Sequence, residues 1–206
     1  ALIGRYGELP TERFEESRQA GLALLNREKE EKNQDRRAFN VDRNKINTID
    51  FRPYANNGFH DFATWKREGE KGIRNTPWGV VDCNGVPFQF VRSDHNEERT
   101  CIYVDPRHVS HVKEIAVESL VRNLYFLQAA TADDAGVLFR YIVNYRDGSR
   151  VEIPIRNKIE SDHWKNLNRK ADGRKAVPGW KNLEGEGLWL YRWRNPHPDR
   201  EISSLE

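Results

Sequence analysis

The chain has 206 residues, of which 34 are basic and 32 acidic, so its formal net charge of +2 argues against a strongly basic nucleic-acid-binding surface. Hydrophobic residues make up 37% of the sequence, which suffices for one domain with a core of its own. No apolar run approaches the roughly 20 residues that a membrane span needs. Neither nucleic acid nor a membrane span is therefore expected.

The first part of the chain, residues 1–45, differs in texture from the rest and is predicted to form an N-terminal extension. About half of its residues from position 11 onward are charged, and the two signs nearly balance. Phe14, Leu22 and Leu25 form a thin apolar stripe at helical spacing, which predicts a helix over about 11–37. The stripe is too narrow for a core helix, so it would lie on a partner or a flanking domain or belong to a linker. Packing on its own domain is the alternative.

From residue 46 the chain is rich in short runs of branched and aromatic residues separated by turn signals. The predicted strands are 46–51, 86–91, 100–105, 113–119, 124–130, 138–145, 150–156 and 188–193. Between two of them, Asp147-Gly148 is expected to supply the positive φ angles of a tight hairpin turn. No helical segments alternate with these runs, so the fold class is all-β over residues 46–206, an antiparallel sandwich or jelly roll.

The stretch WRNPHPDREI, residues 193–202, follows an apolar run and places a histidine between two prolines. Asn195-Pro196 and His197-Pro198 remove two backbone donors and favour extended geometry before each proline. A metal or catalytic role for His197 would need a second ligand nearby, and the stretch has no other histidine. It therefore predicts a corner at which one strand ends and the next begins.

Several segments occur together in an order that is similar to a known family. They are FRPYANNGF (51–59), NTPWGV with NGVPFQFV (75–91), LYFLQAA (124–130), YRDGSRVEIPI (145–155), HW (163–164) and GLWLYRWRNPHPDREI (187–202). Together they resemble a galactose-binding-like β-sandwich module, of the kind appended to glycan-degrading and other large secreted proteins of planctomycete-type bacteria. The resemblance covers residues 46–206 and implies a jelly-roll fold, carbohydrate recognition and an extracellular or cell-surface location. Family members usually continue into another strand, and the charged extension lies outside their pattern.

The tryptophans are the strongest positive sign of sugar binding, because the apolar C–H face of a sugar ring stacks on an aromatic ring. Planar polar side chains nearby would bind the hydroxyl groups. The candidate sugar-binding residues, three loop tryptophans and their polar neighbours, are Trp65, Arg74, Asn75, Asp162, Trp164 and Trp180. The alternative is that each loop tryptophan folds back over an end of the sandwich. Trp78, Trp189 and Trp193 lie in or beside apolar strands and are expected in the core.

No cofactor is expected to be required, but a structural calcium ion is a candidate because hard oxygen ligands suit it. Asn56, Asp61 and Glu201 would hold it if the first and last strands lie side by side. Ordinary turn capping by these side chains is the alternative. Cys83 and Cys101 are either two buried free thiols or a disulfide between neighbouring strands.

Enzyme signatures are missing from the sequence: there is no G-x-S-x-G elbow, no H-E-x-x-H and no phosphate loop. No pair of carboxylates stands out for glycoside hydrolysis either. We therefore expect a non-catalytic carbohydrate-binding module of an extracellular protein, with a glycan or polysaccharide as its partner. The alternative is a self-assembling structural subunit, such as a fibre or surface-layer protomer, that docks on a neighbour through residues 1–45.

Overall fold

The computed structural model describes residues 39, 41–59, 73, 75–97, 99–105, 109–131, 135–168 and 173–206. Contacts group Phe39–Glu206 into one compact unit. The predicted N-terminal helix over about 11–37 lies outside the described residues. Among the residues that are described, no helix is long and apolar enough to cross a membrane.

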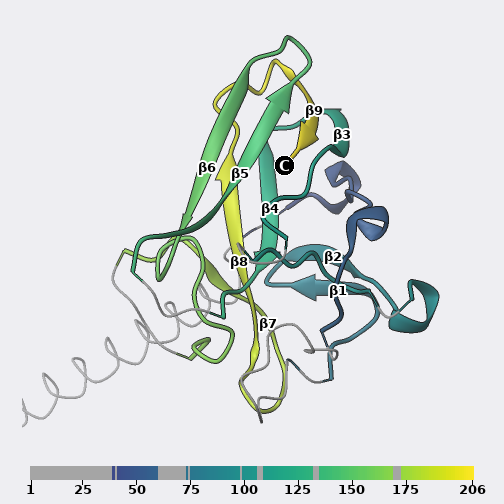
Figure 1. Cartoon of the computed structure of the whole chain (residues 1–206), viewed down its shortest axis with the longest axis vertical. Helices are drawn as coiled ribbons and strands as arrows, with labels where there is room; N and C mark the ends of the chain where they lie inside the picture. The colour runs from purple at the N-terminus through teal and green to yellow at the C-terminus, as the bar shows by residue number, and fades with distance from the viewer. Residues whose placement is uncertain are drawn as a thin grey trace, which may run out of the picture. The chain divides into compact units, whose positions relative to one another are not determined.

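The described unit is built from antiparallel strands, which confirms the all-β fold class. The strands are β1 (Gly79–Cys83), β2 (Val86–Phe90), β3 (Ile115–Leu120), β4 (Asn123–Gln128), β5 (Val137–Tyr145), β6 (Arg150–Arg156), β7 (Val177–Lys181), β8 (Gly187–Arg194) and β9 (Glu201–Leu205). Short 3-10 turns occur at η1 (Arg43–Lys45), η2 (Arg52–Tyr54) and η3 (Ser93–His95). The strands form a hairpin β1-β2, a four-stranded sheet β3-β9-β5-β6 and a three-stranded sheet β4-β8-β7 (Figure 1).

The main core lies between the four-stranded sheet and one face of the three-stranded sheet. It draws on β4 and β8 from one side and on β5, β6 and β9 from the other, with Phe126 stacked on Tyr141 at 4.1 Å between ring centroids. Its buried members are Leu124, Phe126, Val143, Tyr145, Ile153, Ile155, Leu167, Ala176, Trp189, Tyr191, Trp193, Ile202 and Leu205. Two sheets thus bury their inner faces against each other, as in a β-sandwich.

A second, smaller core covers the other face of the three-stranded sheet. Leu188 on β8 packs there with Cys83 and Phe90 of the β1–β2 hairpin. Side chains alternate between the two faces along a strand, so Trp189 faces the main core while Leu188 faces the hairpin. Burial on both faces explains why β8 reads as a nearly unbroken apolar run in the sequence.

Both short hairpins have turns that their sequences favour. In the β1–β2 turn, Asn84 and Gly85 have φ angles of 54° and 90°, the pattern of a two-residue type I′ turn. Between β5 and β6, only Gly148 has a positive φ, whereas Asp147 does not. The prediction of two positive φ angles was wrong there, because the loop has three residues: the Gly148 N–H donates to the Tyr145 carbonyl at 3.0 Å, and Ser149 pairs with Tyr145.

The stretch 193–202 is a corner, as predicted. β8 ends at Arg194 and β9 begins at Glu201. The side chain of Asn195 is 3% exposed and fixes the corner: its Oδ1 accepts from the Tyr145 hydroxyl at 2.6 Å, and its Nδ2 donates to the Val121 carbonyl at 2.9 Å. The ring of His197 lies edge-on to Tyr145.

Two predicted strands, 46–51 and 100–105, do not form. Instead, the side chain of Asn56 accepts from the Tyr103 N–H at 2.7 Å and donates to its carbonyl at 2.9 Å, so an amide takes the place of a neighbouring strand. Only an isolated bridge joins Asn57 to Cys101. Strands β1 and β7 were not predicted, and β9 was predicted only as the strand after the corner, without bounds; β7 contains Pro178 and Gly179, which are unusual inside a strand.

Candidate functional site

The structure describes part of the predicted sugar-binding set. Trp65, Arg74 and the calcium candidate Asp61 lie outside the described residues. Asn75 is exposed, with a φ of 55°, in the segment that leads into β1. Trp180 is half-buried on β7 and packs near Phe90 at 6.0 Å between ring centroids.

Trp164 and Asp162 are both 2% exposed, so they face the interior of the protein and not solvent. Trp164 belongs to the smaller core, and the Lys165 ammonium lies 4.5 Å from its ring centroid. In this conformation its ring offers no free face to a sugar. The structure therefore favours the alternative interpretation, a tryptophan folded back over an end of the sandwich.

Asp162 is held by a network of buried polar groups. It forms an ion pair with Arg174, and its Oδ1 accepts from the His163 N–H at 2.7 Å and from Asn166 Nδ2 at 3.1 Å. The Arg174 guanidinium also lies 4.1 Å above the Trp189 ring. The network therefore ties residues 162–166 to Arg174, which packs on Trp189 of the main core.

Glu160 is the second buried carboxylate of this segment, at 2% exposure. It pairs with Arg156 and lies 3.4 Å from Lys175 Nζ. Burial alone would raise the pKa of Glu160, but the hydrogen bonds from Arg156 and Lys175 outweigh burial and hold the pKa below its usual value of 4.5. Its backbone carbonyl accepts from Gln128 Nε2 at 2.9 Å. Glu160 is therefore an ionised structural anchor at this end of the sandwich.

The calcium candidates that are described do not come together. Both polar ends of the Asn56 side chain bind Tyr103, and Glu201 on β9 pairs with Arg146 at 2.9 Å. Segment 46–51, the expected first strand, is not a strand, and β3 and β5 flank β9 instead. Within the described part of the chain, no group of three or more histidine, cysteine, aspartate or glutamate side chains is arranged to hold a metal ion. With Asp61 outside that part, calcium binding stays a prediction.

Both cysteines are free thiols in the structure. Burial raises the pKa of Cys83 and of Cys101 to about 12. The thiolate is the nucleophilic form of cysteine, so both side chains are unreactive at neutral pH.

For Trp78, the environment predicted from the sequence was wrong. The prediction put it in the core, but its side chain is 68% exposed. It precedes β1 by one residue, and Val80, the second residue of β1, is 72% exposed. The opposite face of β1 packs on the smaller core through Val81 and Cys83. The alternation of the strand thus directs Val80 outward, and Trp78 comes just before the strand, next to Gly79 with its φ of 83°.

Polar side chains lie beside Trp78 and Val80. Gln89 on β2 lies directly opposite Val80 and is exposed. The Arg92 guanidinium lies 5.4 Å from the Trp78 ring centroid and is oriented by Asp94, whose Oδ1 is 2.7 Å from Arg92 Nε. We call Trp78, Val80, Gln89 and Arg92 the hairpin face. It combines an aromatic ring with amide and guanidinium groups on a regular β-hairpin, which Figure 1 shows beside the lower part of β8.

One signal in the sequence could have found the hairpin face. Asn84-Gly85 between two apolar runs is a strong indication of a tight hairpin. That turn makes GVVDC a strand whose outward residues include Val80, close in sequence to Trp78.

Comparisons of the chain with protein-family models, with curated proteins and with solved structures found no match.

Proposed function

We propose that the protein is a non-catalytic carbohydrate-binding module, and that the hairpin face is its sugar-contacting surface. One observation carries the proposal: a tryptophan with 68% of its surface exposed stands on an ordered hairpin beside planar polar groups. Isolated exposed apolar residues are common on protein surfaces, but here an exposed tryptophan and an exposed valine are separated by a single residue, Gly79.

The chemistry of the hairpin face suits a sugar. The C–H face of a pyranose ring packs on the indole of Trp78 and on Val80, while hydroxyl groups bond to Gln89 and Arg92. Guanidinium stacking on one side of the indole limits the rotation of the ring, which lowers the entropy lost on binding. The face is open, so a bound sugar would keep much of its solvent contact and the affinity would be weak.

The proposal includes the jelly-roll topology and the location that the family resemblance implies. Strand β3 pairs with β9, and β4 pairs with β8. The consecutive strands β3 and β4 lie in different sheets, and so do β8 and β9. This nested pairing supports a jelly roll related to galactose-binding-like modules. An extracellular or cell-surface location belongs to the same proposal.

Glycan-array screening followed by calorimetry tests the function. Replacing Trp78 with alanine should weaken binding of any array-positive glycan by at least about tenfold, because the stacking surface is lost. Trp78→Phe should retain part of the affinity. Leu183→Ala is the matched control, since Leu183 is fully exposed on the β7–β8 turn and distant in sequence from the hairpin.

A binding affinity that is the same in Trp78→Ala and in the unaltered chain would contradict the assignment of the hairpin face. Circular dichroism of each variant separates loss of binding from loss of fold.

Self-assembly through residues 1–45 remains the alternative prediction, and residues 1–38 and 40 of the extension lie outside the described residues. Two features disfavour the addition of a neighbour's strand to the four-stranded sheet. Edge strand β6 carries Pro154, and edge strand β3 is interrupted by a bulge in which Glu118 has a φ of 45°. Prolines and bulges at sheet edges hinder pairing with another chain.

A further inference from the structure

Most arginines in the described part of the chain have a carboxylate partner within ion-pair distance. The paired ones are Arg43, Arg52, Arg92, Arg99, Arg140, Arg146, Arg156, Arg174 and Arg200. The others, for which the described residues provide no such partner, are Arg122, Arg150, Arg192 and Arg194. With 34 basic and 32 acidic residues overall, a local group of unpaired arginines is not a consequence of net charge.

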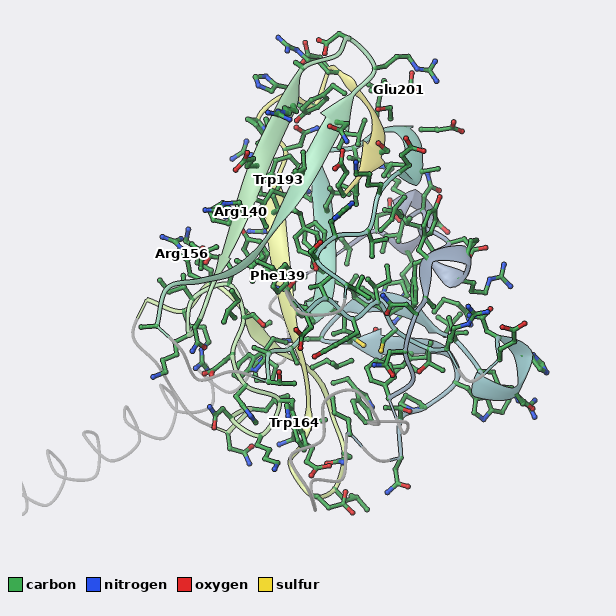
Figure 2. All side chains as sticks on the ribbon, in the orientation of Figure 1. Phe139, Arg140, Arg156, Trp164, Trp193 and Glu201 are labelled. Atoms are coloured by element: carbon green, nitrogen blue, oxygen red, sulfur yellow. The ribbon has the colours of Figure 1, made fainter. Side chains whose placement is uncertain are left out.

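Two of these four arginines lie on the same face of one strand. Arg192 and Arg194 are exposed and alternate on β8 with Trp193, which points into the main core. Arg194 lies opposite Asn123 on β4, and the carbonyl of Arg122 accepts from the Asn195 N–H at 2.9 Å. We call Arg192 and Arg194 the arginine corner. It occupies the end of the three-stranded sheet where β4 begins and β8 ends, and in Figure 2 the labelled Trp193 marks this part of β8.

The arginine corner is partly ordered before any ligand binds. The Arg192 guanidinium lies 5.0 Å from the ring centroid of Phe39, which in turn packs edge-on against Tyr125 at 5.6 Å. Tyr125 is the residue opposite Arg192 in the sheet. Stacking on a neutral ring restricts the guanidinium without neutralising it, so its charge and its donors stay available.

Phe39 is also in close contact with the turn of the β1–β2 hairpin. The carbonyl oxygen of Phe39 would lie 2.2 Å from a Cβ atom at Gly85, a position whose φ of 90° already favours glycine. The hairpin turn therefore fits closely over the backbone of Phe39 and holds its ring beneath Arg192.

We propose that the arginine corner binds an anionic polysaccharide, one that carries sulfate or carboxylate groups. Guanidinium groups match the geometry of both anions and bind them through paired hydrogen bonds. Arg192 and Arg194 are two residues apart on a strand, so their Cα atoms are about 6.6 Å apart, a spacing that suits successive charges along a polymer. The corner is an open surface where each contact contributes little, so a ligand with several charges is favoured over a small ion. The assignment to a polysaccharide, and not to another polyanion, rests on the proposed carbohydrate-binding function.

Binding of the full chain to heparin, polygalacturonate and neutral dextran tests this inference. The probes carry sulfate, carboxylate and no charge, respectively, and so separate the two anion sources. The double variant Arg192→Gln/Arg194→Gln should bind heparin, polygalacturonate or both about tenfold more weakly than the unaltered chain. Affinity should also fall as salt concentration rises. Arg150→Gln is the matched control, because Arg150 is also exposed and unpaired but lies on β6.

Three results would each overturn the inference. They are an equal loss in Arg150→Gln, no binding to either anionic polysaccharide, and equal affinity for polyglutamate or single-stranded DNA of similar charge. The hairpin face is tested on neutral glycans through Trp78→Ala, whereas the arginine corner is tested on anionic polymers through the double variant. Failure of the hairpin face on neutral glycans and failure of the arginine corner on anionic ones are therefore separate outcomes.

Discussion

Two tryptophans of this protein have a cation over the ring and yet opposite environments. Trp164 is 2% exposed beneath Lys165, whereas Trp78 is 68% exposed beside Arg92. The first lies in a polar stretch, SDHWKN, and the second precedes an apolar one, WGVV, so local polarity suggests the reverse. The difference lies in what surrounds each side chain: Trp164 packs with Cys83, Phe90 and Leu188 in the smaller core, while Trp78, just before β1, faces solvent. Burial is set here by partners that are distant in the sequence.

The largest expected contrast is in stability. Trp164→Ala should lower the free energy of unfolding by about 3–5 kcal/mol, because a large side chain leaves a cavity in the smaller core. Trp78→Ala should change the same quantity by no more than about 0.5 kcal/mol. Urea denaturation of both variants measures the difference. Similar losses would mean that Trp78 also supports the fold, which would weaken its assignment to a ligand.

An intermediate contrast concerns the two ion pairs that hold arginines beside aromatic rings. Asp162→Asn removes the charged partner of Arg174, whose side chain is only 9% exposed, and should cost about 3 kcal/mol. Asp94→Asn removes the partner of Arg92, where both side chains are about half exposed, and should cost less than about 1 kcal/mol. Equal costs in thermal and urea unfolding would show that burial does not distinguish the two pairs.

The smallest expected effect is on the response to acid. The pKa of Glu160 is lower in the folded chain than in the unfolded chain, so its contribution to stability is present above the usual value of 4.5 and is lost as pH falls through the folded value. Glu160→Gln should therefore be less stable than the unaltered chain at pH 7 but lose less stability between about pH 5 and pH 2. Glu184→Gln, on the exposed β7–β8 turn, serves as the control. Parallel stability–pH curves for the Glu160 variant and the unaltered chain would show that Glu160 does not contribute to the loss of stability in acid.

The elements that could be predicted from the sequence are those whose signals are local. The β5–β6 hairpin combines alternating strands with a glycine turn, and β8 is apolar on both faces, so both were found. Strand β9, EISSL, has a weak pattern of its own and is stabilised by β3 and β5, far away in the sequence. Strand β7 is hidden by Pro178 and Gly179, where a Cβ on the glycine would lie 2.5 Å from Leu127 Cδ1.

The candidate site was harder to predict than the fold, for a related reason. The residues chosen from their polar contexts, Asp162 and Trp164, are buried because Asp162 pairs with Arg174 and Trp164 packs in the smaller core with Phe90 and Leu188. The hairpin face depends on one turn, at Gly85, and on which side of β1 meets the smaller core. The residue types of a strand can be taken directly from the sequence, but which face of that strand packs against the rest of the protein cannot.

The position of β9 has a consequence for how the molecule is made. Glu201–Leu205 lies between β3 and β5, so the four-stranded sheet has a gap at its centre until residues near position 205 have been synthesised. During translation β3 and the β5–β6 hairpin emerge with nothing to join them, and their apolar inner faces stay accessible to other chains. Nascent chains of this protein should therefore complete their sandwich only late in synthesis, and premature termination before residue 201 should yield aggregation-prone products.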